Sequence, residues 1–179
     1  DSDAYLQASL YAYKLEPSAD AAIGCAAMAF KKGDIDGSVK FFDEAISYET
    51  DNVKKAESAY KAASVLASAK KISQARSYAQ KAISFNENYG APYILIAQLY
   101  AGNYKWNDEP ALNKCTFFAA IDKLQRAKAV DPSVAEEANK LISSYSAYTP
   151  EAKDLFMLGY KAGDRITIGG WIGETTTIR

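Results

Sequence analysis

The sequence contains no histidine, and this absence limits the chemistry that the chain can support. Histidine is the general base of Ser-His and Cys-His nucleophile pairs, and it is the commonest protein ligand of transition metals. The acidic residues offer no substitute, because Asp34-Ile-Asp36-Gly37 resembles the start of a calcium loop but the remaining ligands do not follow. We therefore expect no enzymatic activity, no metal site and no cofactor.

Cysteine is scarce as well. The sequence has only Cys25 and Cys115, which lie far apart and stand among small or apolar residues. Two such residues do not form a disulfide framework. We expect both to be free and buried, where a thiol packs like a small hydrophobic side chain.

Long apolar runs and an excess of charge are also missing. No window approaches the roughly 20 apolar residues of a membrane span, and no signal peptide is recognisable. The 21 basic and 22 acidic residues give a net charge of −1, which attracts neither nucleic acid nor anionic lipid. Because the chain begins at Asp1 instead of methionine, we expect a mature form or the C-terminal part of a larger protein.

A recurring stretch organises the remaining sequence, which has the balanced composition of a globular protein. Residues 81–86 (KAISFN) nearly repeat residues 44–49 (EAISYE), and weaker echoes occur at residues 12–17 and 127–132. The aligned alanines at 12, 45, 82 and 127 are separated by 33, 37 and 45 residues. Periods of about 34 residues indicate repeats of two helices.

The apolar spacing predicts where these helices lie. We expect a helix of a truncated repeat at 3–15, repeats at about 20–50, 55–87 and 90–132, and a capping helix at 133–148. An insertion at 102–113 explains the longest interval, and one continuous helix should follow it to about Val130. Buried alanines such as Ala63 and Ala82 should let the helix axes approach closely.

One segment matches a known signature in its spacing. Tyr93-x-x-Ile96-Ala97-x-x-Tyr100 has the spacing W-x2-L-G-x2-Y, although the signature Trp and Gly are missing. Residues 3–148 as a whole resemble tetratricopeptide (TPR) repeats. The resemblance implies an all-α, right-handed solenoid of antiparallel helix pairs, in which the first helix of each pair lines a concave groove for another polypeptide.

The positions that correspond to this groove carry apolar, aromatic or small side chains. They are Ile23, Ala27, Phe30, Tyr60, Ser64, Ile94 and Gln98. TPR domains that clamp a C-terminal carboxylate need lysines and asparagine there, so the sequence argues against that role. We expect the groove to bind an unidentified protein or peptide, or the chain's own C-terminal tail.

The tail, residues 149–179, changes in composition. A short helix should reach about Leu158, and the glycine-, threonine- and isoleucine-rich segment after it should be extended or form a β-hairpin that turns near Gly169. The predicted anchors of the tail are Phe156, Trp171 and Ile172. In the inserted loop, Trp106 either packs the loop onto the helices or acts as an interaction residue.

The end of the tail resembles the C-termini of TPR proteins from Bacteroidetes, which close on a Gly-Gly-Trp-Ile…Thr-Thr-Thr-hydrophobic-Arg pattern. The matching residues here are 169–172 and 175–179, within GGWIGETTTIR. This resemblance implies a bacterial, exported protein of the cell envelope, either periplasmic or secreted.

Three functions fit these observations. The first is a non-catalytic protein-interaction scaffold that binds a polypeptide in the concave groove. The second is a self-assembly module, in which the tail or the first helix stacks on a neighbouring copy. The third is a small-ligand carrier that uses groove tyrosines such as Tyr60, Tyr93 and Tyr100, although tyrosine also serves to bury a ring while its hydroxyl reaches water.

Overall fold

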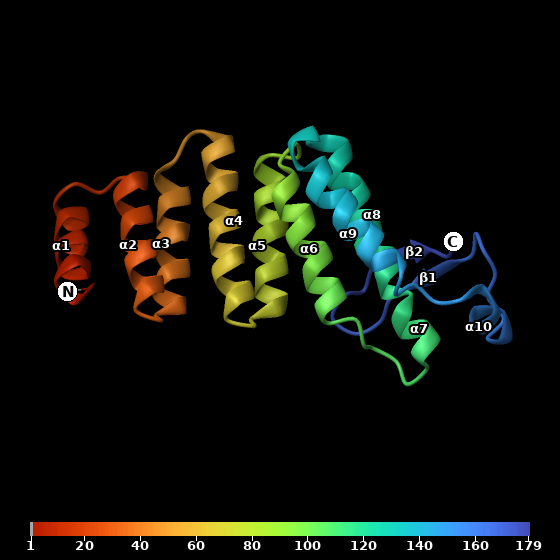
Figure 1. Ribbon diagram of the computed structural model, residues 1–179. Helices are drawn as coiled ribbons and strands as arrows, with labels where there is room; N and C mark the ends of the chain where they lie inside the picture. The colour runs from red at the N-terminus through yellow and green to blue at the C-terminus, as the bar shows by residue number, and fades with distance from the viewer. Residues whose placement is uncertain (1) are drawn as a thin grey trace. The chain divides into compact units, whose positions relative to one another are not determined.

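The computed structural model describes residues 2–179, and the chain divides into two compact units, Asp1–Tyr89 and Gly90–Arg179. Helices are the main elements of both units, and one short strand pair lies near the C-terminus (Figure 1). The predicted all-α fold of helix pairs with a short extended tail is therefore confirmed. In the described part of the chain, no helix combines the length and apolar character that a membrane span requires.

The first unit contains two helix pairs and one preceding helix. Its elements are α1 (Ser2–Leu15), α2 (Ala19–Lys31), α3 (Ile35–Tyr48), α4 (Asn52–Ser68) and α5 (Ile72–Phe85). Helix α2 packs on α3 and α4 packs on α5, while α3 also contacts α4 and α1 contacts α2. Each helix thus packs on its neighbour in sequence, as the 34-residue period predicts.

The same backbone turn ends the first helix of both pairs. After α2, Gly33 has φ +79° and the next amide bonds back to the carbonyl of Ala29 at 3.0 Å. After α4, Lys70 has φ 60° and the next amide bonds back to Leu66 at 2.9 Å. This is the Schellman ending, whose left-handed residue is usually glycine. The second pair therefore places a lysine where the first pair has the favoured residue.

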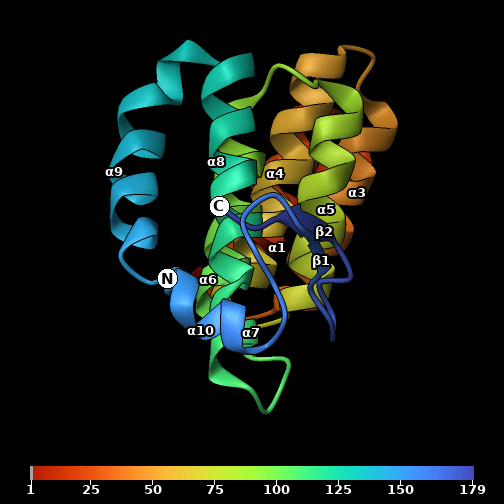
Figure 2. The same cartoon turned by 90° about the vertical axis from the view of Figure 1, so that its right-hand side faces the viewer.

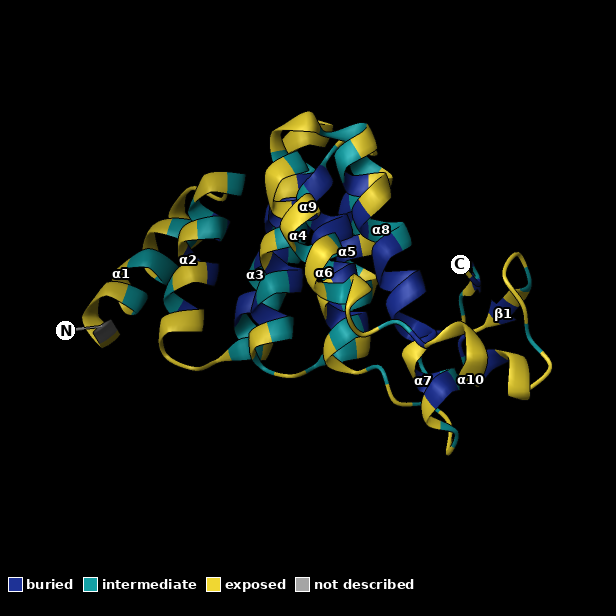
Figure 3. Ribbon diagram, turned by 45° about the vertical axis from the view of Figure 1, so that its right-hand side comes forward, coloured by how far each residue is buried: buried dark blue, intermediate teal, exposed yellow. Residues whose placement is uncertain are grey.

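Alanines form much of the contact surface between the helices of the first unit. Ala63 and Ala82, expected at close crossings, are completely buried. Ala26 and Ala62 pack with Phe42 in one core cluster. These small side chains leave room for the larger ones between the helices, and Figure 3 shows the buried residues along the inner faces.

The second unit pairs α6 with α8 and then adds α9. Its elements are α6 (Gly90–Gly102), α7 (Pro110–Lys114), α8 (Thr116–Val130), a 3-10 turn (Pro132–Val134), α9 (Ala135–Ser146), α10 (Ala152–Met157), β1 (Arg165–Thr167) and β2 (Thr175–Thr177). Helix α8 contacts both α6 and α9, and strand β2 also packs on α8. In the view of Figure 2, α9 and the strand pair flank α8 on two sides.

The helix predicted to run unbroken to Val130 is interrupted at Cys115, which separates α7 from α8. Polar side chains near the break hold the inserted loop. Thr116 Oγ1 donates to the carbonyl of Tyr104 at 2.9 Å, and Asn113 Oδ1 accepts from the amide of Trp106 at 2.7 Å. These bonds tie the helix start to the loop, because Thr and Asn side chains can bond to nearby backbone groups in place of the helix ladder.

The tail forms an antiparallel hairpin in which Arg165 pairs with Thr177 and Thr167 pairs with Thr175. A hairpin of this size is marginal in water by itself. Here its isoleucines Ile166, Ile168, Ile172 and Ile178 are buried. Polar contacts add to this burial, since Thr176 Oγ1 donates to Asp122 of α8 at 2.6 Å and Arg179 forms an ion pair with the same carboxylate. The tail is therefore an integral part of the second unit.

Candidate functional site

On the first helices of unit 1, the predicted groove residues form partly exposed surfaces. Ile23, Ala27 and Phe30 share one face of α2, which flanks the strip of buried alanines, and Phe30 is 41% exposed. On α4, Tyr60 and Ser64 are half-buried. Each helix thus presents a mixed apolar surface to solvent.

The α4 residues are held in place by neighbours within the unit. The ring of Tyr60 meets the ring of Tyr89 edge to face, with centroids 5.4 Å apart. The hydroxyl of Ser64 donates to the carbonyl of Tyr60 at 3.0 Å. This part of the surface is therefore ordered by its own contacts before any ligand arrives.

In unit 2, the two predicted groove residues of α6 differ. Gln98 is exposed, whereas Ile94 is only 4% exposed, and the expectation that Ile94 lines an open groove is wrong. The expectation rested on the position of Ile94 in the TPR motif, one step after Tyr93. Helix α6 is apolar around most of its circumference and buries Tyr93, Ile96 and Tyr100 as well, as expected for a largely enclosed helix.

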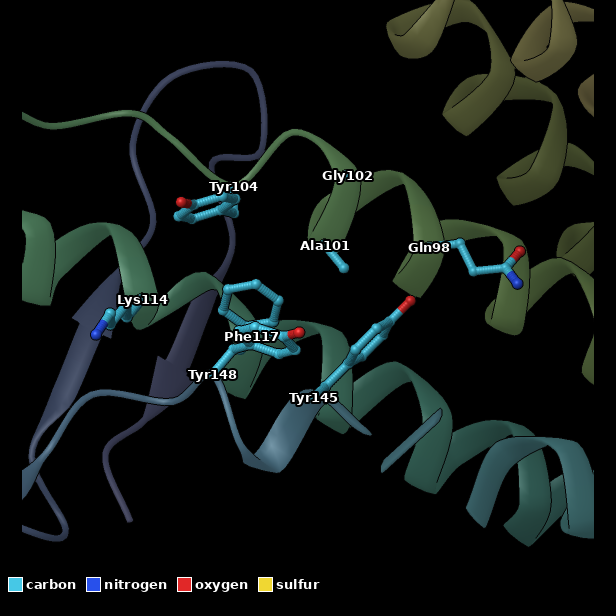
Figure 4. A pocket seen from close by; sticks show the side chains of 8 residues that line it. All are labelled: Gln98, Ala101, Gly102, Tyr104, Lys114, Phe117, Tyr145 and Tyr148. Atoms are coloured by element: carbon cyan, nitrogen blue, oxygen red, sulfur yellow. The ribbon is translucent and has the colours of Figure 1, made fainter. Parts of the chain in front are cut away.

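A cavity of about 440 Å³ lies beside Gln98 in unit 2 (Figure 4). Its wall comes from α6, the inserted loop, α7, α8 and the segment at the end of α9. The lining residues are Gln98, Ala101, Gly102, Tyr104, Lys114, Phe117, Tyr145 and Tyr148. Only Gln98 among them was predicted from the sequence as a groove residue. Volumes of roughly 300–1,000 Å³ are typical of sites that hold a small molecule or a few side chains.

Phe117 is the centre of the aromatic wall. Its ring centroid lies 5.2 Å from that of Tyr104, 5.9 Å from that of Tyr145 and 5.5 Å from that of Tyr148, which stacks on it. Tyr148 itself is 58% exposed. Ring pairs at these separations stabilise one another beyond simple burial. The cavity therefore has a preformed apolar wall with tyrosine hydroxyls at its edges.

The charged group of the cavity is Lys114, which is exposed and forms no salt bridge within residues 2–179. The pKa of Glu151 is lowered by a hydrogen bond from Lys153, by the charge of Lys153 and, to a smaller extent, by the charge of Lys114. Burial raises the pKa of Tyr145, so its hydroxyl stays protonated and can donate a hydrogen bond. The polar groups of the cavity suit binding and positioning of a ligand.

Comparison with solved structures identifies the fold. The TPR2B domain of yeast Sti1, in its complex with pHsp70, superposes with a TM-score of 0.56 and 22% identity, covering 72% of this chain and 96% of that one. Two structures of MamA give TM-scores of 0.56 and 0.55 at 16% identity, covering 88% and 83% of this chain and 88% and 79% of theirs. The chain has the TPR fold. At the sequence level, no family model and no curated protein matches it.

The tail of this TPR-fold chain is attached through aromatic residues. The ring of Trp171 packs edge to face on Tyr100 of α6 at 5.5 Å, and Ile172 beside it is buried. Trp106, from the inserted loop, lies so close to Gly169 that a Cβ there would be 2.6 Å from its Cε3. Phe156 was also predicted as an anchor, and this is wrong, because it is 76% exposed while its neighbour Leu155 is buried.

The tail and the cavity use different positions on the same two helices. The tail contacts Tyr100 on α6, and Phe118 and Asp122 on α8. The cavity is lined instead by Gln98 and Ala101 on α6 and by Phe117 on α8. Residues one or two positions apart on a helix point in different directions. The docked tail therefore packs beside the cavity-lining face of these helices.

Both cysteines are free and buried, as expected. Burial raises the pKa of Cys115 to about 11, and burial together with the charge of Glu44 raises that of Cys25. Such thiols are protonated at neutral pH and are poor nucleophiles.

Within residues 2–179, no three His, Cys, Asp or Glu side chains come together in an arrangement that could hold a metal ion.

Proposed function

We propose that this chain is a non-catalytic protein-binding module, and that the aromatic cavity of unit 2 receives an apolar side chain from a partner polypeptide. The observation that carries the proposal is the open cavity walled by Tyr104, Phe117, Tyr145 and Tyr148. Tyrosine-rich pockets are typical centres of protein interfaces, because the rings bury area while the hydroxyls bond to the partner's backbone.

The surroundings of the cavity favour a polypeptide ligand. Gln98 and the tyrosine hydroxyls supply hydrogen-bonding groups for amides, and Lys114 can pair with an acidic group beside the bound side chain. The TPR2B domain of Sti1, which shares the fold, is solved in complex with pHsp70, so the fold is compatible with such a partner. The exposed faces of α2 and α4 offer additional contact area in unit 1.

Peptide selection followed by measurement tests the proposal. Peptides selected on the whole chain from a random display library should carry aromatic or branched apolar residues. Tyr148→Ala should weaken their binding by about tenfold or more, because it removes an exposed wall of the pocket. Tyr11→Ala is the matched control, since Tyr11 is similarly exposed on α1.

Equal binding by the Tyr148→Ala variant, the Tyr11→Ala variant and the unchanged chain would refute the cavity as the peptide site.

A small-ligand carrier remains the second candidate, because the cavity volume also fits a small molecule. Native mass spectrometry of the purified chain would reveal such a ligand as a species heavier than the chain itself. The fraction of this species should be smaller for the Tyr148→Ala variant.

We further propose a location in a bacterial cell envelope, which rests on the resemblance of the tail alone and is tested by cell fractionation.

A further inference from the structure

The end of α10 exposes three consecutive apolar side chains. Phe156 is 76% exposed, Met157 is 85% exposed and Leu158 is 40% exposed, while Leu155 of the same helix is buried. Figure 3 shows this helix with mostly exposed residues around one buried position. Large contiguous apolar patches are rare on monomers and mark interaction surfaces. We call Phe156, Met157 and Leu158 the α10 knob.

A hollow adjoins the α10 knob on the same surface. It has a volume of about 600 Å³, and its walls are mainly apolar. Phe156 and Met157 of the knob form one side of it, and the rest of α10, the segment after it and the end of the tail line the remainder, including Leu155, Tyr160, Ala162 and Ile178. The knob is therefore a protruding wall of the hollow, and in a two-fold arrangement the protruding wall of each copy can enter the hollow of the other.

The charges around the hollow distinguish a neutral partner surface from an anionic lipid surface or a strongly charged protein. Lys153 and Arg179 are each engaged in a salt bridge with an acid of the same chain. Asp154 and Lys161 line the hollow as well, and neither forms a salt bridge within residues 2–179. Among the lining residues outside salt bridges, one acid and one base leave no excess of either sign, and the charge of Asp154 also acts on its neighbour Lys153. An anionic lipid surface or a strongly charged partner would instead require such an excess.

A two-fold dimer can pair both the apolar features and the charges of this surface. In an isologous dimer the same patch of both copies forms the contact. If one residue of the first copy meets a second residue of the other copy, the reverse pair meets as well. Asp154 of each copy can then meet Lys161 of the other. The apolar knob of each copy can enter the hollow of the other in the same arrangement.

We propose that the α10 knob and the hollow beside it form a homodimer interface, in which Phe156 and Met157 insert into the hollow of a second copy and Asp154 pairs with Lys161 across the two-fold axis. This interface does not depend on the proposed peptide site, because it uses none of the residues that line the aromatic cavity.

Sedimentation velocity of the whole chain, from micromolar to submillimolar concentration, measures the interface directly. We expect a concentration-dependent shift from monomer to dimer. Phe156→Asp should raise the dimer dissociation constant by about tenfold or more, since it places a charge in the apolar contact. Val53→Asp is the matched control, because Val53 is an exposed apolar residue of unit 1, and it should dimerise like the unchanged chain.

Charge reversal provides a test that a general loss of structure cannot imitate. Lys161→Glu and Asp154→Lys should each weaken the homodimer, because each variant sets like charges against each other. A mixture of the two variants should form heterodimers, since the remaining Asp154 then faces the remaining Lys161 and the two introduced charges are opposite. A chain that stays monomeric throughout, or a mixture without heterodimers, would overturn the proposal. So would binding to vesicles of anionic lipid in place of dimer formation.

Discussion

The hydroxyl of Tyr100 on α6 donates a 2.8 Å hydrogen bond to Oε1 of Glu174 in the tail. The other oxygen of this carboxylate pairs with Lys123 on α8 at 3.0 Å. One tail side chain therefore joins both helices of the α6–α8 pair. Because Tyr100 is completely buried as a residue, its polar end depends on partners such as this one.

Tyr100→Phe removes the hydroxyl while keeping the ring. We expect it to lower the free energy of unfolding by about 1.5–3 kcal/mol, the usual range for a hydrogen bond to a charged group. Urea denaturation followed by circular dichroism measures the change. Tyr11→Phe, at an exposed position, should leave the stability unchanged, and an equal effect of both substitutions would contradict the assigned role of the bond.

Gly169→Ala tests the contact between the inserted loop and the tail. The added methyl would sit 2.6 Å from Cε3 of Trp106, so the ring or the tail has to move. We expect a loss of about 1–3 kcal/mol, typical of overpacking, and a change in tryptophan fluorescence. The control is Gly24→Ala on α2, where no atom apart from the adjoining helix backbone lies within 4 Å of the new methyl, and it should stabilise the helix by up to about 1 kcal/mol. A double variant that also carries Trp106→Ala should lose most of the strain.

Lys70→Gly tests the left-handed turn between α4 and α5. A non-glycine residue at φ 60° has a conformational cost of roughly 1–2 kcal/mol, of which glycine's greater unfolded-state freedom offsets about half. We therefore expect a gain of about 0.5–1 kcal/mol in thermal or urea denaturation. Gly33→Ala at the equivalent turn should have the opposite effect. A loss of stability in Lys70→Gly would show that the side chain contributes more than the strain removes.

Asp131 should make the stability of unit 2 depend on pH. Hydrogen bonds from Ser133 and from the amide of Gly90 lower its pKa in the folded chain. A lowered pKa gives stabilisation that is complete above the unfolded value of about 4 and is lost as the pH falls through the folded value. Asp131→Asn should therefore flatten this acid-side loss in urea titrations from neutral pH to pH 3, and Ser133→Ala should reduce it. An unchanged pH profile in both variants would refute the assignment.

Much of the fold could be predicted from the sequence, because its core is local and periodic. The alanines at Ala45, Ala82 and Ala127 recur with the helix pairs, and all three are completely buried. The break at Cys115 could not be predicted in the same way. It depends on side-chain bonds from Asn113 and Thr116 to a loop whose path the sequence does not specify.

The candidate site was harder to predict, since it joins segments that no repeat relates. Gln98 follows the repeat pattern, whereas Tyr104 belongs to the insertion, Tyr145 to the end of α9 and Tyr148 to the turn after it. The available signal was the three-residue spacing of Tyr145 and Tyr148, which places them on one side of the helix predicted at 133–148, although α9 ends at Ser146. Two predictions of exposure were wrong: Ile94, predicted in an open groove, is buried, and Phe156, predicted as an anchor, is exposed. The exposure of a residue depends on neighbours from distant parts of the chain, which the local pattern does not show.

The enclosed position of α6 affects the folding of the nascent chain during synthesis. The α2–α3 pair can close once its own residues have left the ribosome, because its contacts are local, and the bond from Ser38 to Ala26 spans only 12 positions. Tyr100 must wait for Glu174, 74 positions later. Until then, a strongly apolar helix remains uncovered in the nascent chain, where it is open to chaperones and to aggregation. Synthesis of the tail segment around Glu174 therefore determines when α6 becomes covered.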